Sequence, residues 1–216
     1  MKTFFLVFSL LAIILAIYPF LDTSEDSSSV YGLPWQIEVL PDGSSRVFGL
    51  TMGNTSLAEA IKILGDDMAL AIIAAPDEPG SLEMYYGHYR AGLLSGKLVL
   101  QTIVEDDELF RWRENAVSSE YMPSGLAKKY MLSENDLAAV LEQKITGLTF
   151  IPAVNLDEEI ILARFGEPVR RVQQGDATHY LYPDKGLDIA WYPDAKEVMQ
   201  YVSPAAFQRL VAPLAE

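Results

Sequence analysis

Apolar residues form one long run at the N-terminus and then recur with helical or alternating spacing through the rest of the chain. Residues 4–21 (FFLVFSLLAIILAIYPFL) carry no charge, and as a helix they would rise about 27 Å, close to the hydrocarbon thickness of a bilayer. Lys2 precedes this run, and the acidic, Ser-rich segment DTSEDSSS follows it. The positive-inside rule therefore predicts a transmembrane anchor with residues 1–3 in the cytoplasm and the rest of the chain across the membrane.

A cleaved signal peptide is the alternative interpretation of the same run. Such peptides have apolar regions of about 7–15 residues that end in a small-x-small site. Here the run is longer, and bulky residues and a proline (Tyr18, Pro19, Phe20 and Leu21) occupy the positions where cleavage would be expected. The pattern favours an anchor over a cleaved signal, and either one exports the remaining domain.

Alternating and helical patterns predict a first folded unit at residues 33–104. Trp35 to Phe48 places the turn Pro41-Asp42-Gly43 between two alternating runs, which indicates a β-hairpin. Ser56 and Glu59 have the spacing of a capping box, so a helix is expected to begin there and to end at Gly65. Strands are expected at 69–74, 81–86 and 97–104.

Residues 105–146 have a different pattern, and we expect a helical connector there. Helices are predicted at 108–116 and at 133–145, where SENDLAAVLEQKI carries an N-cap serine and one apolar face. The stretch between 122 and 130 contains a proline and a glycine and fits no single element.

The first pattern then returns at residues 147–216. Gly147-Leu148-Thr149 repeats Gly49-Leu50-Thr51, and a helix from Leu156 ends at Gly166 as the first ends at Gly65. Strands are expected at 169–173, 178–182, 187–191 and 197–202, with a short helix at 205–211. We predict an α+β fold: an anchor at 4–21, a tether at 22–32, and two helix-plus-antiparallel-sheet units related by internal duplication.

The charge of the chain limits the classes of partner. The formal net charge is −14, and after Lys2 there are 15 basic and 30 acidic residues. Such a surface repels phosphate backbones, so nucleic acid is not expected to bind. The chain has no cysteine, which excludes disulfides, thiolate metal sites, a cysteine nucleophile and a lipid-modified cysteine anchor.

The second unit resembles a known family. A helix ends in Phe165-Gly166-Glu167-Pro168, a strand follows, and then come His179-Tyr180-Leu181-Tyr182-Pro183 and Gly186-Leu187-Asp188-Ile189. This succession is similar to the SmpA/OmlA-type outer-membrane assembly lipoproteins and to the tandem repeats of the β-lactamase inhibitor protein family. The resemblance covers residues 147–202, and more weakly 49–104. It implies helices packed on a short antiparallel sheet and binding of other proteins, in the envelope of a Gram-negative bacterium. The lipobox cysteine and the disulfides of these families are absent, so outer-membrane anchoring does not follow.

Exposed aromatic side chains are the candidate protein-interface residues. Alternate residues of a strand point to opposite faces, so some strand tyrosines should face outward, where Tyr and Trp suit a protein interface. The candidates on the predicted strands or at their ends are Tyr85, Tyr86, Tyr89, Tyr180, Tyr182, Trp191 and Tyr192.

Catalytic and metal-binding patterns are weak. His88 and His179 could form a metal pair or a general base, yet no third ligand stands at a recognisable spacing. The acidic clusters at 66–67, 105–108 and 157–159 fall at helix ends and loops, where acids commonly cap helices or stay solvated, and no EF-hand pattern supports calcium. No serine-nucleophile or phosphate-loop motif occurs. We therefore expect no catalytic residues, cofactor or metal.

The expected function is a non-enzymatic, membrane-tethered protein-binding module or adaptor. Its location would be the inner membrane, with the soluble domain in the periplasm and another envelope protein as partner. Two alternatives remain open: an inhibitor or regulator of a periplasmic enzyme, and an envelope hydrolase that uses His88 or His179 with nearby acids.

Overall fold

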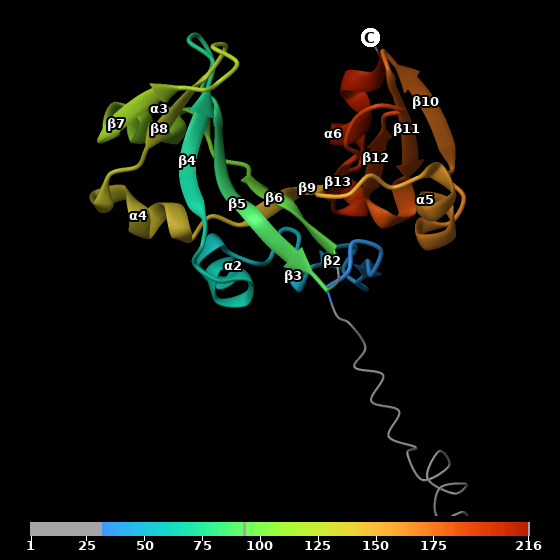
Figure 1. Ribbon diagram of the computed structural model, residues 1–216. Coiled ribbons are helices and arrows are strands. Elements are labelled where there is room, and N and C mark those ends of the chain that lie inside the picture. Colours follow the sequence, from blue (N-terminus) through green and yellow to red (C-terminus); the bar gives the residue numbers. More distant parts are fainter. Residues whose placement is uncertain (1–31, 93, 216) are drawn as a thin grey trace, which may run out of the picture. The chain divides into compact units, whose positions relative to one another are not determined.

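Two antiparallel sheets and five α-helices make up the fold in a computed structural model that describes residues 32–92 and 94–215 (Figure 1). The predicted α+β class is confirmed. The proposed anchor at 4–21 lies outside the described residues, and within them no helix is both long and apolar enough to cross a membrane. Residues from Gly32 onward form one compact unit.

The larger sheet has ten strands, all paired antiparallel, in the order β10-β11-β12-β13-β9-β6-β5-β4-β8-β7. Its strands are β4 (Ala69–Ala74), β5 (Ser81–Ala91), β6 (Leu94–Thr102), β7 (Ser118–Tyr121), β8 (Lys128–Met131), β9 (Ile145–Pro152), β10 (Arg170–Gln174), β11 (Ala177–Tyr182), β12 (Leu187–Trp191) and β13 (Val198–Val202). The pairing of β6 with β9 joins the two predicted units into a single sheet.

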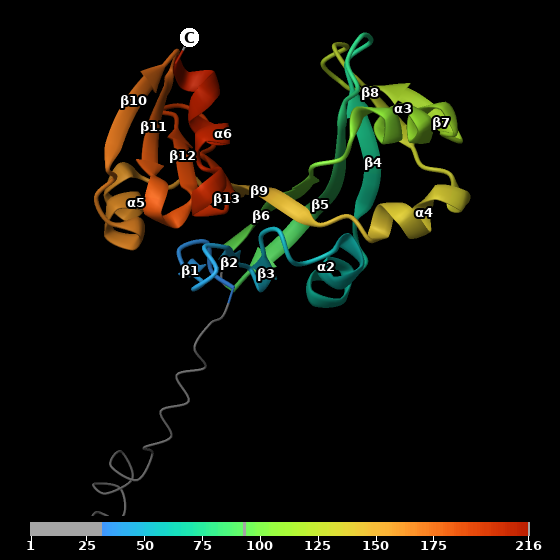
Figure 2. The ribbon, with the colours of Figure 1, turned by 180° about the vertical axis from the view of Figure 1, so that it is seen from behind.

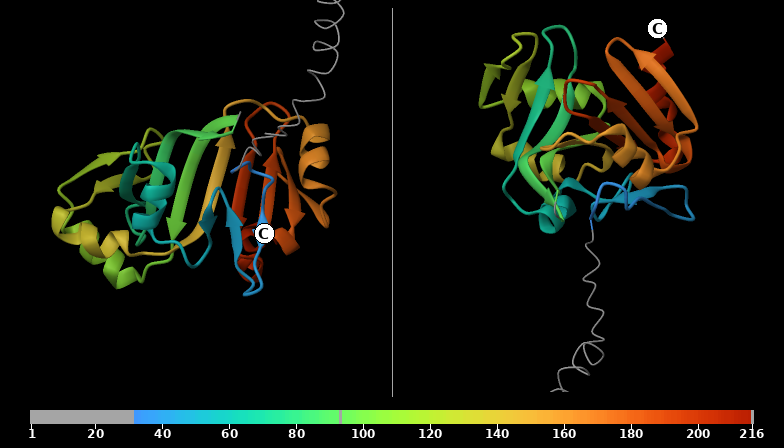
Figure 3. Two further views of the ribbon diagram at one scale, coloured as in Figure 1. Left: turned by 90° about the horizontal axis from the view of Figure 1, so that it is seen from below. Right: turned by 45° about the vertical axis from the view of Figure 1, so that its right-hand side comes forward.

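The smaller sheet contains β1 (Glu38–Val39), β2 (Ser45–Val47) and β3 (Leu50–Thr51), and it includes the predicted hairpin. Phe48 and Gly49 form the turn between β2 and β3, and both have positive φ, 54° and 79°. This backbone fits a tight hairpin turn but is unusual for Phe. The ring of Phe48 lies 5.3 Å from that of Phe150 and 5.9 Å from that of Tyr201, so the turn anchors the small sheet to the middle strands of the large one (Figure 3).

The α-helices of the described residues, apart from the short C-terminal one, pack their apolar sides into one continuous core with one face of the large sheet. The α-helices are α2 (Leu57–Leu64), α3 (Asp106–Glu114), α4 (Glu134–Leu141), α5 (Glu158–Phe165) and α6 (Gln208–Val211), with short 3-10 turns η1 (Pro183–Lys185), η2 (Pro204–Ala206) and η3 (Ala212–Ala215). Fully buried side chains of this core include Leu57, Trp112 and Ile161. By contrast, α6 lies beside β12 and β13 on the side away from α5 (Figures 1 and 2).

Local signals set most element boundaries. Ser56 caps α2 with the predicted capping box: its hydroxyl accepts from the Glu59 amide, and the Glu59 carboxylate accepts from the Ser56 amide. The predicted helix at 133–145 proved too long, because α4 ends at Leu141 and Ile145 already belongs to β9. The stretch at 122–130 is a turn and part of β8, within a hairpin with β7 that the sequence pattern did not predict.

The repeated Gly-Leu-Thr tripeptides do not occupy equivalent places. Leu50 and Thr51 form β3 of the small sheet, whereas Gly147-Leu148-Thr149 lies in β9 of the large sheet. Both helices that follow, α2 and α5, do end at a glycine, Gly65 and Gly166 respectively. The two helices therefore end alike, whereas the two tripeptides lie in different sheets.

Candidate protein-binding surface

The seven candidate aromatic residues are divided between the core and the surface. Tyr86, Tyr180 and Tyr182 are buried, which corrects the prediction that their side chains contribute to an interface. Tyr89 and Trp191 are partly buried and pack against the core cluster, and Tyr192 is half-buried after the end of β12. Only Tyr85, with 38% of its surface accessible, is an exposed member of the set.

Tyr86 and Tyr182 can be buried because their hydroxyl groups donate hydrogen bonds to backbone carbonyl oxygens. The Tyr86 hydroxyl donates to the carbonyl oxygen of Gly65 over 2.9 Å, and the Tyr182 hydroxyl donates to that of Gly166 over the same distance. Burial raises the pKa of both phenols to about 12, so both stay neutral donors at physiological pH. The aromatic bodies fill the core, and the hydroxyls satisfy backbone groups at the helix ends.

A β-bulge moves Tyr89 to the covered face. The register of β5 and β6 pairs Tyr86 with Leu98 and Tyr89 with Gly96, so β5 has one extra residue there. Without the bulge, Tyr89 would share a face with Tyr85; with it, Tyr89 shares a face with Tyr86. Its ring packs edge-on against Phe48 at 5.5 Å.

The opposite side of the central strands carries a mixed set of half-exposed or exposed side chains. We call it the open face and define it by Glu83, Tyr85, Val99, Gln101 and Thr149. The register places Tyr85 opposite Val99, Val99 opposite Thr149, and Glu83 opposite Gln101, so these side chains are neighbours across β5, β6 and β9. An aromatic ring, an aliphatic side chain and polar groups side by side are typical of a protein interface.

The C-terminal segment borders the open face. Arg209 of α6 donates to the carbonyl oxygen of Thr146 over 3.4 Å, and Gln174 of β10 donates to that of Pro213 over 2.8 Å. A hollow of about 170 Å³ lies between α6 and the adjacent strands β9 and β13. It is lined in part by Gln101, Thr149 and Arg209. The open face therefore ends at a small polar depression with a basic side chain at its rim.

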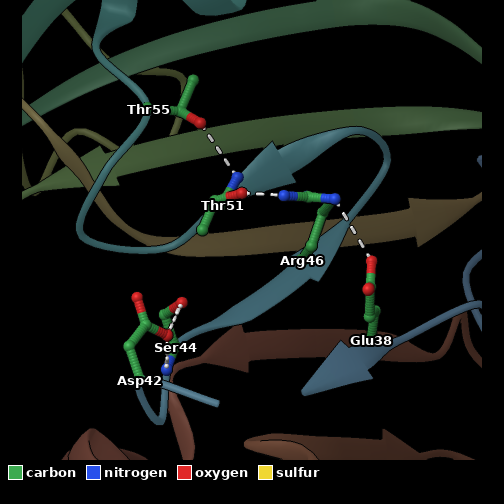
Figure 4. A network of polar contacts seen from close by, with 6 residues as sticks. All are labelled: Glu38, Asp42, Ser44, Arg46, Thr51 and Thr55. Carbon is green, nitrogen blue, oxygen red and sulfur yellow. Dashed lines mark hydrogen bonds and ion pairs between the residues drawn. The ribbon is translucent and has the colours of Figure 1, made fainter. Parts of the chain in front are cut away.

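A second concave region lies between the small sheet and α2. The groove has a volume of about 470 Å³ and is lined by Leu40, Arg46, Thr51, Asn54, Thr55, Glu59, Lys62 and Ile63. Figure 4 shows the side chain of Arg46 lying between Thr51 and Glu38; it donates to the Thr51 hydroxyl over 3.1 Å and to the Glu38 carboxylate over 3.3 Å. These contacts tie Arg46 to the small sheet itself.

The two histidines have different environments. His88 is exposed on β5. His179 is buried on β11, and its Nδ1 lies 2.8 Å from a carboxylate oxygen of Asp188 on β12. Burial raises the pKa of Asp188, and the hydrogen bond and the charge of His179 partly oppose that rise. The geometry is that of a histidine oriented by a buried carboxylate within the sheet, with its ring enclosed by protein.

The acidic clusters remain mostly at the surface. Asp106, Asp107 and Glu108 occupy the first turn of α3, and Glu158 and Glu159 that of α5, where the helix dipole favours negative charge. Within the described ranges, no group of three or more metal-binding side chains converges.

Sequence reasoning overlooked a buried carboxylate, Glu197. One of its oxygens accepts a hydrogen bond from the backbone amide of Leu156 over 2.9 Å, and the other has no hydrogen-bond partner. Glu197 thus connects the start of β13 to the segment that leads into α5. Nothing in the local pattern distinguishes this glutamate from the solvated acids.

Comparisons with known proteins leave the chain without an assigned family. No protein-family model matches it, and neither curated proteins nor solved structures give a significant match. The family resemblance therefore rests on the sequence motifs alone.

Proposed function

We propose that this protein is a membrane-tethered, non-enzymatic binding module of the bacterial cell envelope, and that its open face contacts a partner protein. The observation that carries this proposal is the accessible row Tyr85–Val99–Thr149 across three central strands. Central strands of a large sheet usually bury their apolar side chains, and an accessible Tyr and Val beside polar groups suit a protein partner.

Residues 4–21 would hold this module at the inner membrane, with the folded domain in the periplasm. This part of the proposal rests on the length and apolarity of that run and on the charge asymmetry around it. Protease treatment of spheroplasts should degrade the folded domain, and N-terminal sequencing of the membrane fraction should find residues 1–21 still attached. A shortened, freely soluble protein would contradict the anchor.

We also propose that the two halves of the domain arose by duplication of a helix followed by antiparallel strands. Supporting this, α2 and α5 both end at a glycine whose carbonyl oxygen accepts a bond from a tyrosine on the second strand that follows. A chance arrangement would not be expected to repeat the same donor, acceptor and order of elements.

Crosslinking in intact cells tests the binding proposal. The tagged full-length protein is compared with Val99→Asp, which places a charge in the open face, and with Val169→Asp, a control at an exposed valine before β10. We expect a reproducible envelope partner that the Val99 variant loses and the Val169 variant keeps. Circular dichroism should show both variants folded, and equal capture by both would overturn the role of the open face.

A further inference from the structure

One end of the ten-stranded sheet is an accessible edge formed by β7. In the described part of the chain, β7 pairs with β8 and with no other strand, and all four of its residues are exposed. Val117, just before it, has 70% of its surface accessible, and Tyr121 at its end has 65%. A free strand edge with two large exposed apolar side chains is a template for pairing with another strand.

The side chains of β7 point alternately to the two sides of the sheet. Tyr121 lies opposite Lys128, and Ser119 lies opposite Tyr130, so Ser119 and Tyr121 share the side on which α3 contacts Tyr130 through Arg113. Ser118 and Glu120 point to the other side, where Glu120 forms an ion pair with Lys129 over 3.6 Å. The amide of Val117 donates to the carbonyl oxygen of Met131 over 3.0 Å, and Ser118 lies opposite the same Met131, so the regular ladder with β8 begins at Ser118.

The backbone N–H and C=O groups of β7 point alternately toward β8 and outward. Met122 and Ala127 are the next pair along the hairpin after Tyr121 and Lys128. The amide of Met122 donates to the carbonyl oxygen of Ala127 over 2.8 Å, so this pair is hydrogen-bonded. Hydrogen-bonded and non-bonded pairs alternate along an antiparallel ladder. Glu120 and Ser118 therefore direct their backbone groups toward β8, while Ser119 and Tyr121 direct theirs outward.

We propose that β7 pairs antiparallel with β7 of a second copy of this chain, about a two-fold axis through Ser119. In this register Ser119 faces Ser119 of the other copy, and each Tyr121 meets the segment at Val117 where the regular ladder of the other copy begins. The outward-pointing backbone groups of Ser119 meet their counterparts in the hydrogen-bonding phase. The backbone of the edge is thus complementary to itself at Ser119.

Charge favours a second copy at this edge. In the proposed register Glu120 faces Ser118 of the other copy, so the two glutamates do not oppose each other directly. Residues 117–131 contain two lysines and one glutamate, a net charge of +1 in a chain of net charge −14. The hairpin is therefore a place where two acidic molecules can approach with little repulsion, and the short contact predicts a weak dimer.

Disulfide trapping tests this register, because the chain has no cysteine of its own. In a hydrogen-bonded antiparallel pair the two Cα atoms at position 119 would lie about 5.5 Å apart, within disulfide range. At position 118 the corresponding atoms would lie about 8 Å apart, beyond that range. Under a mild oxidant, purified full-length Ser119→Cys should form a covalent dimer in high yield, and Ser118→Cys should form at least fivefold less.

A second pair of variants separates strand pairing from random collision. Tyr121→Pro, combined with Ser119→Cys, removes an outward-pointing amide and should abolish the crosslink while leaving the pairing with β8 intact. Tyr121→Phe in the same background should preserve it. Circular dichroism confirms that each variant is folded. Equal crosslinking at positions 118 and 119, or none at 119, would overturn the proposal and leave the edge free or available to a different strand.

Discussion

The hydroxyl of Tyr182 donates a hydrogen bond to the carbonyl oxygen of Gly166, over a distance of 2.9 Å. Gly166 ends α5, and Tyr182 ends β11, the second strand after that helix. Tyr86 of β5 makes the same contact with Gly65 at the end of α2. Each bond satisfies a helix-terminal carbonyl group that has no intrahelical partner, and it ties that helix to the sheet.

Removing either hydroxyl should therefore weaken the fold. We expect Tyr182→Phe and Tyr86→Phe each to lower the free energy of unfolding by about 1 kcal/mol, because a partly buried carbonyl group loses its donor. Urea unfolding followed by circular dichroism measures this change. Tyr85→Phe on the exposed open face is the matched control and should change stability little; a loss as large there would contradict the explanation.

These tyrosines also predict alkaline sensitivity. Burial is the main cause that raises the pKa of Tyr86 and of Tyr182 from the ordinary value of 10.0 to about 12, with smaller contributions from the charges of Asp66 and Glu167 respectively. The folded state thus favours the neutral phenol, so this stability is fully present below pH 10 and is lost as pH rises toward 12. Melting temperatures measured from pH 9 to 12 should fall less steeply for Tyr182→Phe than for the wild type. Identical slopes would show that the buried phenol does not control the alkaline transition.

Phe48 should be among the most sensitive positions of the core. Its ring lies within 6 Å of those of Tyr89, Phe150 and Tyr201, and it holds the small sheet against the large one. Phe48→Ala should cost about 3–5 kcal/mol through lost burial and a cavity. Phe110→Ala, at an exposed phenylalanine of α3, is the control and should cost far less in the same urea titration.

Gly96 is needed for the close approach of β6 and β9. A Cβ atom at this position would lie 2.4 Å from the carbonyl oxygen of Ile151 and 2.6 Å from the ring of Phe150. Gly96→Ala should therefore destabilise the protein by about 1–3 kcal/mol, as overpacking does. At Gly87 on β5 the nearest atom to such a Cβ would be 3.5 Å away, on the ring of Tyr85, so Gly87→Ala should be tolerated. Similar thermal unfolding of the two variants would refute this account.

Local signals in the sequence predicted the elements well where neighbouring residues determine them. The capping box of Ser56 and Glu59, the turn at Pro41–Gly43 and the glycine ends of α2 and α5 depend on side chains and backbone groups only a few residues apart. The β7–β8 hairpin was not predicted, because its strands are short and polar. They belong to the large sheet through the pairing of β8 with β4, which is distant in the sequence.

Contacts between residues far apart in the chain decide which face of each strand is buried. Alternation separates Tyr85 from Tyr86, yet it does not say which of them meets the helices. The bulge after Tyr86 then reverses the expected side of Tyr89, and nothing in the sequence YYGHYR marks that extra residue. For this reason only Tyr85 of the seven candidate aromatic residues is exposed, and the candidate surface is centred on it.

The sequence by itself determined the α+β class, most element boundaries and the apolar run at 4–21, because these follow from spacing and composition along the chain. Only the tertiary structure decided that one ten-stranded sheet joins both halves, that Tyr86, Tyr180 and Tyr182 are buried, and that Asp188 meets His179. Strand order and burial arise from contacts between residues far apart in the chain, where hydrophobic burial selects one packing among many that the same local pattern allows.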